Sequence, residues 1–353
     1  MRRTFLTPQQ ANYSLLDGRN SVKKLINDPN QVVREAIEGL ALAYPQYLRQ
    51  VESLHAVVRR DAPVRNKVAV LTGGGSGHEP MFAGFVGRGM ADGSVAGNIF
   101  TSPPPAPIVT TAKAIHSGAG VLFLYGNYSG DTLNFDMAAE MLEADGIQVN
   151  TVRITDDVAS APSGQQAERR GIAGDFFVIK VAGACAETGA TLSEVTAAAE
   201  EANQNSRTMG IALSSCIIPA SGRPIFDISE QEVELGMGLH GEPGIQRGPM
   251  KSADEVARQM VGAILTDIPM ARGTEVAVMV NGLGATPLAE LFIIFRAASR
   301  ILSAAGISIV RSYVGNYATS LEMAGCSVTL MRLTARLKPL LLAPADSPAC
   351  VQV

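Results

Sequence analysis

The sequence predicts an α/β protein built from two α/β domains with mixed or mostly parallel sheets. Two observations carry this prediction. Short runs of β-branched and large apolar residues alternate along the chain with longer stretches of helical pattern, which is typical of α/β folds. The chain has 353 residues, 46% of them hydrophobic and 18% charged. It is therefore long enough for two cores of ordinary size.

Eight apolar runs are expected to form strands, because each is short and is bounded by residues that favour turns or helix starts. Ligands collect beyond the carboxyl ends of strands in open α/β sheets, so the site is expected in a crevice there. In chain order the runs are KVAVL (67–71), GVLFLY (120–125), VNTVRI (149–154), FFVIKVAG (176–183), GIALSSC (210–216), EVAVMVNG (275–282), ISIVRS (307–312) and SVTLMRL (327–333).

Helices are expected between these strands. The stretch 188–206 places Thr191 and Glu194 as a capping box ahead of an alanine-rich run, which is the signature of a helix N-terminus. A second helix is expected over 287–305. The polar segment 156–175 lacks periodicity and is interpreted as a long exposed loop.

The domain organisation follows from this order of elements. Residues 1–20 are expected to be an N-terminal extension. Residues 21–185 are expected to form the first α/β domain and residues 186–353 the second. A return of the extreme C-terminus to the first domain is left open.

Composition excludes several classes of partner. A net charge of −4 without a long basic run argues against nucleic acid or an anionic membrane, because both are bound through clusters of Lys and Arg. The start MRRTFLTPQQ has no apolar core of signal-peptide length, and the apolar run LFIIF is bounded by Glu290 and Arg296. We therefore expect a cytoplasmic protein whose partners are small molecules and other proteins.

The cysteines are expected to be buried free thiols rather than a disulfide or a zinc site. They lie far apart without a C-x-x-C spacing, and most stand among apolar or small residues. They are Cys185, Cys216, Cys326 and Cys350.

The segment LTGGGSGHEPMFAG (71–84) has the glycine content of a phosphate-binding loop but not its chemistry. A P-loop needs Lys followed by Ser or Thr after its last glycine, and His78 and Glu79 stand there instead. A dinucleotide fingerprint is matched only loosely, with Asp92 as the distant acid. The glycines predict a tight turn with accessible N–H groups, and hence a cradle for a small polar ligand.

Three side chains are candidates for chemistry. His78 and His240 are each flanked by glycines and followed by Glu-Pro or Gly-Glu-Pro, whereas His55 and His116 lie in ordinary helical surroundings. A histidine among glycines on a loop faces space that a ligand can occupy. Asp131 follows the strand at 120–125, so one crevice could hold all three side chains. The competing interpretation of Asp131 is a helix N-cap.

Five phrases resemble, in order, the sugar-binding K subunit of the dihydroxyacetone kinase family. They are GGGSGHEP, GNYSGDTLNF, RRGIAG, GLHGEPGI and NGLGATPLAEL. The resemblance runs from about SVKKLINDP (21–29) to the C-terminus.

The resemblance implies that His240 holds the carbonyl carbon of a short ketose as a covalent hemiaminal. It implies that His78 hydrogen-bonds the sugar and that Asp131 orients or deprotonates the hydroxyl that receives the phosphoryl group. A three-carbon sugar offers too few atoms for tight noncovalent binding, so a covalent anchor is physically reasonable. The sugar is also expected to contact the glycine segment at Gly74, Gly75, Ser76 and Gly77.

The resemblance also implies that this chain is half of an enzyme. Nucleotide and magnesium are expected on a separate all-helical L-type subunit, because no nucleotide motif stands after residue 340, and no cofactor or metal is expected on this chain. The donor, ATP or a phosphoenolpyruvate relay through bound ADP, stays open. A homodimer is expected.

The sequence departs from the family at two positions. Gly126 stands where many members have lysine, and Phe82 where many have histidine. An enlarged pocket at Gly126 would admit a ketotetrose such as erythrulose beside dihydroxyacetone. Two other classes are weighed: a non-catalytic ketose-sensing co-regulator of transcription, against which His78, Asp131 and His240 argue together, and a dehydrogenase, which lacks a well-spaced ribose-binding acid.

Overall fold

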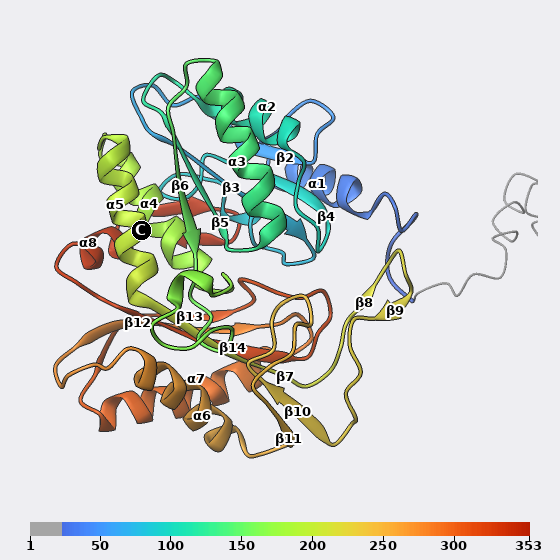
Figure 1. Cartoon of the computed structure of the whole chain (residues 1–353), viewed down its shortest axis with the longest axis vertical. Coiled ribbons are helices and arrows are strands. Elements are labelled where there is room, and N and C mark those ends of the chain that lie inside the picture. The colour runs from blue at the N-terminus through green and yellow to red at the C-terminus, as the bar shows by residue number, and fades with distance from the viewer. Residues whose placement is uncertain (1–22) are drawn as a thin grey trace, which may run out of the picture.

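The computed structural model describes residues 23–353, and the expected extension at 1–20 lies outside these residues. Two six-stranded sheets lie one above the other, with helices between them and on their outer faces (Figure 1). Both sheets mix parallel and antiparallel pairs, which confirms the predicted fold class.

The first sheet has the strand order β1-β2-β4-β3-β5-β6. Strands β4, β3, β5 and β6 are parallel to one another. Strand β2 pairs antiparallel with both β4 and β1. The expected runs at 67–71, 120–125 and 149–154 all lie in it. The bounds are β1 Leu48–Gln50, β2 Ala56–Arg59, β3 Ala69–Ser76, β4 Gly93–Ile99, β5 Val121–Gly126 and β6 Val149–Ile154.

The second sheet has the order β11-β10-β7-β14-β12-β13, and only β12 and β13 are parallel. The four expected runs between 210 and 333 overlap its longest strands. The bounds are β7 Ser206–Ala212, β10 Glu232–Leu235, β11 Gln246–Pro249, β12 Glu275–Gly282, β13 Ser308–Gly315 and β14 Gly325–Arg332; a small hairpin, β8 Ile217–Ile218 and β9 Arg223–Pro224, projects beside it.

The expected strand at 176–183 is wrong, because this segment lies inside helix α4, Asp175–Glu187. Every residue from Asp175 to Ala186 is buried, since α4 lies between the two sheets. A helix that is apolar on all sides has no 3.6-residue pattern, so its run of apolar residues resembles a buried strand.

The remaining helices cover the sheets or pack on another helix. Two pack on one face of the first sheet, two on its other face and two on the outer face of the second sheet, and the short α8 packs against α4. The capping box at Thr191 and Glu194 is present, and the helix expected over 287–305 is confirmed. The bounds are α1 Val32–Ala43, α2 Pro105–Ile115, α3 Ser129–Ala144, α5 Leu192–Asn205, α6 Ala253–Asp267, α7 Leu288–Ala304 and α8 Leu337–Leu342.

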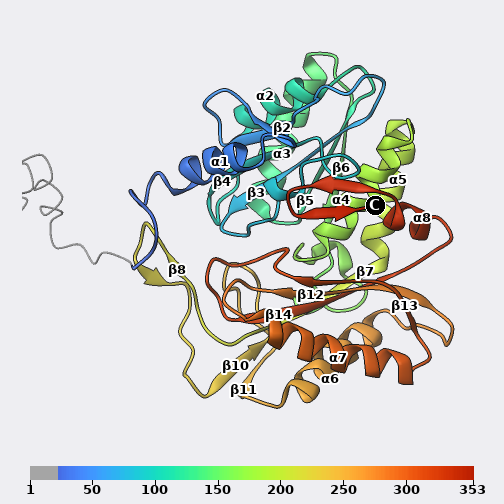
Figure 2. The ribbon, with the colours of Figure 1, turned by 180° about the vertical axis from the view of Figure 1, so that it is seen from behind.

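The C-terminal hairpin, β15 Ala345–Ser347 and β16 Cys350–Gln352, returns to the first half of the chain (Figure 2, red). The Asp346 N–H donates to the Arg88 carbonyl, and the Ala349 N–H donates to the Gly84 carbonyl. The expected domain division after residue 185 stays a prediction; it falls inside the last turn of α4, the helix that packs against α5.

Two further expectations concern the core and the surface. All four cysteines are buried free thiols, as expected. The segment 156–175 is largely without regular structure, but its ends are buried, so the expectation of an exposed loop is wrong for Asp156, Asp157 and Arg169. Among residues 23–353 no helix is both long and apolar enough to cross a membrane.

Candidate functional site

The glycine segment has a different local structure from the one expected. Gly73, Gly74 and Gly75 continue strand β3, and the tight turn comes only at Gly77, whose φ is +101°. A Cβ on Gly74 would lie 2.6 Å from the Phe82 ring, and one on Gly75 would lie 2.7 Å from the Thr101 nitrogen. Close packing of neighbouring segments therefore explains these two glycines, and sugar contacts from Gly74 to Gly77 stay a prediction.

The turn at Gly77 presents His78 to His240 from the second half of the chain. The two Nε2 atoms lie 3.0 Å apart although the residues are 162 positions apart in sequence. His78 is 2% exposed, and the side chain of His240 is 24% exposed. The two histidines singled out by their glycine-rich surroundings therefore form one pair, between the two sheets.

The outer nitrogen of each ring has its own acceptor. His78 Nδ1 lies 2.7 Å from the Thr319 carbonyl, and His240 Nδ1 lies 3.1 Å from the Glu242 carboxylate. Neither oxygen group can donate, because a carbonyl has no proton and the Glu242 carboxylate is ionised. Both Nδ1 atoms must carry a proton. The two Nε2 atoms face each other 3.0 Å apart.

Burial and neighbouring charges shift the pKa values of His78 and Glu242. Burial and the neighbouring His240 lower the pKa of His78 to about 3, so His78 stays neutral. Burial opposes ionisation of Glu242, but the hydrogen bond and charge of His240, with Arg170, lower the pKa of Glu242 to about 2. Glu242 is therefore ionised beside the His240 ring.

Aromatic rings enclose the histidine pair. Phe100 stacks on His78 with a centroid distance of 5.0 Å and meets His240 edge-on at 5.2 Å. Tyr128 meets His240 edge-on at 4.7 Å from the opposite element, just before helix α3. These rings fix the orientation of the imidazoles.

Asp131 lies in the first turn of α3, three residues after Tyr128, and is 8% exposed. The N-cap of α3 is Tyr128, so the cap interpretation of Asp131 is wrong. Burial raises the pKa of Asp131 to about 6, against the opposing effects of Ser102 and His240. Within the described part of the chain its Oδ1 atom has no hydrogen-bond partner. A buried carboxylate oxygen without a partner is costly, which is typical of a group that meets a ligand.

Further polar atoms without partners lie behind Asp131. Asp175, at the start of α4, is fully buried, and burial, Asp156 and Asp131 raise its pKa well above the usual value. Both its carboxylate oxygens and the Tyr128 hydroxyl have no hydrogen-bond partner in residues 23–353. We call Tyr128, Asp131 and Asp175 the acidic corner.

The two departures from the family do not enlarge the pocket. A Cβ on Gly126 would lie 3.1 Å from the Gly171 carbonyl and 3.2 Å from the Tyr128 ring, so the space beside Gly126 is already filled. Phe82 packs under Gly74 and is 7% exposed. The expectation that Gly126 opens room is therefore wrong.

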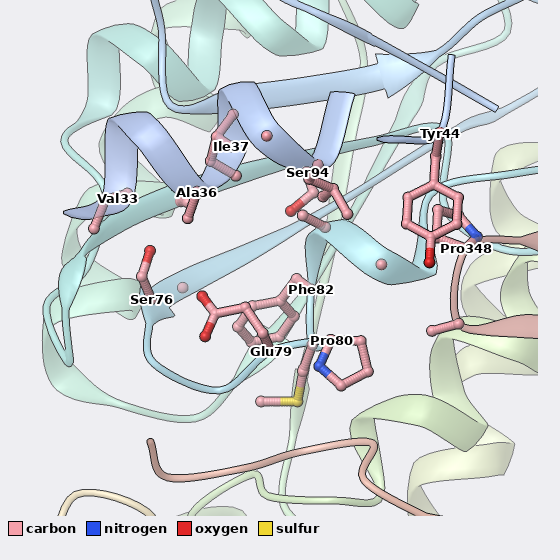
Figure 3. Close-up of a pocket in the computed structure, with 18 of the residues that line it drawn as sticks. Val33, Ala36, Ile37, Tyr44, Ser76, Glu79, Pro80, Phe82, Ser94 and Pro348 are labelled. Atoms are coloured by element: carbon pink, nitrogen blue, oxygen red, sulfur yellow. The ribbon is translucent and has the colours of Figure 1, made fainter. Parts of the chain in front are cut away.

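Phe82 instead borders a cavity of about 580 Å³ between α1 and the segment 74–84 (Figure 3). Apolar side chains of α1 form one wall, and the segment 74–84, with Ser76 and Glu79, forms the opposite one. His78 and His240 do not line it, so this cavity is separate from the histidine pair.

Sequence reasoning missed four residues around the histidine pair. Glu242 could have been found, because it follows His240 by two residues in the phrase HGEP. Phe100, Tyr128 and Thr319 carried no chemical signal, because aromatic rings and a backbone carbonyl enter the site only through the fold. Within the described range, no group of three or more His, Cys, Asp or Glu residues is arranged to hold a metal ion.

Fold and site define an α/β protein with a histidine pair between its two sheets. Residues 38–349 match the Dak1 domain family. The chain is 45% identical over 328 residues to the dihydroxyacetone-binding subunit of PTS-dependent dihydroxyacetone kinase 2 from Listeria innocua, covering 93% of this chain and 98% of that subunit. It is 46% identical to D-erythrulose kinase from Mycolicibacterium smegmatis, covering 92% of this chain and 56% of that kinase.

Solved structures agree with this assignment. The dihydroxyacetone kinase from C. freundii in complex with AMP-PNP and Mg²⁺ superposes with a TM-score of 0.86 at 36% identity, over 94% of this chain and 61% of that one. The dihydroxyacetone kinase operon co-activator DhaQ superposes with a TM-score of 0.85 at 29% identity, over 92% and 99%. The chain belongs to the Dak1 family of dihydroxyacetone kinase subunits.

Proposed function

We propose that this chain is the ketose-binding subunit of a dihydroxyacetone-type kinase and holds its substrate as a hemiaminal on His240. The observation that carries the proposal is the histidine pair, with both Nδ1 atoms held by acceptors and the Nε2 atoms 3.0 Å apart. Because Nδ1 of His240 donates to Glu242, Nε2 is the nitrogen of that ring that can bond carbon.

The covalent step joins His240 to the carbonyl carbon of the ketose. A neutral His240 ring has a lone pair on Nε2; as it attacks the carbonyl carbon, the C=O π electrons move to oxygen, which takes a proton from solvent and becomes a hydroxyl. The Nδ1 atom keeps its proton and still donates to Glu242. The adduct is an N-substituted imidazolium, and the Glu242 carboxylate stabilises its charge.

Asp131 acts on the other end of the sugar. A ketose bonded to His240 extends away from the histidine pair, and a terminal hydroxyl gives the partnerless Oδ1 atom of Asp131 a donor. The carboxylate orients that hydroxyl and accepts its proton as the phosphoryl group arrives, so positioning supplies most of the catalysis.

The phosphoryl donor comes from a second subunit. Nucleotide and magnesium bind to an L-type partner rather than to this chain, and the chain assembles as a homodimer. The chain spans about half the length of the erythrulose kinases that it matches, which leaves room in those proteins for the other half of the reaction.

The substrate is dihydroxyacetone or a ketotetrose such as erythrulose. Relatives of both kinds match at similar identity, 45% for the dihydroxyacetone-binding subunit and 46% for D-erythrulose kinase. A co-regulator without kinase activity is less well supported, because identity to the co-activator is 29%.

The test combines the purified chain with an L-type subunit of a dihydroxyacetone kinase. We expect phosphorylation of dihydroxyacetone or erythrulose by ATP and magnesium, or by a phosphoenolpyruvate relay, only when both proteins are present. Turnover by this chain alone would contradict the two-subunit proposal. Binding of a ketose without turnover in any combination would favour the co-regulator.

A further inference from the structure

The motif RRGIAG carries two adjacent arginines with separate partners. Arg169 is 1% exposed and donates to both carboxylate oxygens of Asp267 at 2.8 and 2.5 Å. Asp267 ends helix α6, and Arg207 also bonds to it. Arg169 therefore ties the segment 155–174 to the second half of the chain.

Arg170 faces the histidine pair instead. Its guanidinium contacts the Asp157 carboxylate at 2.8 Å on one side and the Glu242 carboxylate at 3.7 Å on the other. Asp157 is 1% exposed and also accepts from the Ala159 N–H, so it is a fixed anchor. Arg170 thus links a rigid buried carboxylate to the carboxylate that holds His240.

Gly238 supports this arrangement independently. A Cβ at this position would lie 2.2 Å from Glu242 Oε2 and 2.5 Å from Arg170 Nη1. Any side chain here would separate the two charged groups or displace them. The glycine before the HGEP phrase is therefore explained by the approach of Arg170 to Glu242.

Glu242 receives contacts from both sides of the site. Its Oε1 faces His240 Nδ1, and its Oε2 accepts from the His240 backbone N–H. Because the carboxylate bonds both the ring and the backbone of His240, a rotation of Glu242 would release the imidazole. Arg170 and Asp157 oppose that rotation.

We propose that Arg170 is a positioning residue that acts through Glu242 to hold the His240 ring for attack on the ketose. This inference rests on the proposed function. It assigns to the second arginine of RRGIAG a role in substrate binding, and to the first arginine a role in stability alone.

A double-mutant cycle tests whether Arg170 acts through Glu242. Arg170→Gln, Glu242→Gln and the double variant are titrated with dihydroxyacetone labelled with ¹³C at the carbonyl, and adduct formation is followed by NMR as loss of the ketone resonance. We expect Arg170→Gln to weaken adduct formation roughly three- to tenfold in the wild-type background and less than about twofold in Glu242→Gln. Arg169→Lys is the matched control, expected to lower the melting temperature and leave adduct formation unchanged.

The outcomes separate this inference from the proposed function. An equal effect of Arg170→Gln in both backgrounds, or no effect in either, overturns the role of Arg170 while wild-type adduct formation upholds the proposed function. No adduct in the wild type overturns both. If Arg170→Gln does not fold, Arg170→Lys keeps the charge opposite Asp157 and gives the same comparison.

Discussion

The histidine pair and the acidic corner lie side by side but differ in how completely their polar atoms are satisfied. In the pair, every ring nitrogen of His78 and His240 has a partner. In the acidic corner, Asp131, Tyr128 and Asp175 each keep at least one buried polar atom without a partner within residues 23–353. The hydrogen bonds of the histidine pair are already formed within the protein, whereas those of the acidic corner are incomplete.

This difference separates two tasks. A covalent anchor must be held in one orientation before the sugar arrives, so its hydrogen bonds are made within the protein. A group that accepts a proton from the substrate must leave an acceptor free, and the protein loses stability by burying it. Substitutions in the two regions should therefore have opposite effects.

The largest effect is expected for Asp131→Asn. The amide keeps the size of the carboxylate but cannot accept the hydroxyl proton. With the L-type subunit present, kcat should fall by roughly 10²–10⁴, the range of a lost general base, with the adduct intact. Steady-state kinetics and the ¹³C titration measure the two quantities. A kcat close to that of the wild type would show that Asp131 is not the catalytic base.

His240→Ala should give the complementary result. It removes the carbon-bonding nitrogen, so the adduct disappears and KM for the ketose rises at least about tenfold, or 1.4 kcal/mol. Some turnover should persist, because Asp131 still orients the hydroxyl. An adduct that survives in His240→Ala would place the covalent bond elsewhere.

Stability should change in opposite directions in the two regions. At pH 7, Asp131→Asn should stabilise the fold by roughly 1–3 kcal/mol, because the folded state raises the pKa of Asp131 from 3.8 to about 6. The native carboxylate is protonated first as pH falls, so this gain should shrink between pH 6 and 4. Denaturant unfolding of both proteins across this range measures it. A gain that does not depend on pH would contradict the electrostatic cause.

His78→Ala is the matched variant in the pair. It removes a buried ring that donates to the Thr319 carbonyl, so we expect a loss of roughly 1–3 kcal/mol at pH 7. Denaturant unfolding at pH 7 measures this loss of stability. A variant as stable as the wild type would show that the pair is not the preassembled region.

The pH profile of kcat offers a smaller test. The Asp131 carboxylate must be ionised to accept a proton, so kcat should fall as pH drops below about 6, by tenfold per unit at the limit. KM should not show the same change as the pH drops. A kcat profile that stays flat down to pH 5 would contradict the assigned pKa.

The smallest effect is expected at Phe82. Because it packs under Gly74 and away from the histidine pair, Phe82→His should change the ratio of kcat/KM for erythrulose and dihydroxyacetone by less than about threefold. A competition assay with both sugars measures the ratio. A larger shift would connect the cavity beside α1 to the sugar site.

Much of the fold could be predicted from the sequence, because strands such as 149–154 and 275–282 are short apolar runs with clear boundaries. Helix α4 could not, because burial on all sides removes the pattern that separates a helix from a strand. The short strands β1, β2, β10 and β11 were also missed, since each is too brief for a pattern.

The site was predicted in part. Glycine-rich surroundings indicated His78 and His240, and the structure joins them. The choice between cap and ligand contact at Asp131 needed coordinates, because both interpretations place an acid near the start of a helix. Thr319 lies 241 positions from its partner His78, so no local pattern could indicate that contact.

The central claim is a covalent bond between His240 and the ketose at a preassembled histidine pair. A crystal of the wild-type chain soaked with dihydroxyacetone tests it most directly. The account predicts continuous density between His240 Nε2 and a tetrahedral carbon. His240 Nδ1 should still donate to Glu242, and a terminal hydroxyl of the sugar should lie beside Asp131. A planar ketone that lies in the site without a bond to His240, or a bond to another residue, would contradict it.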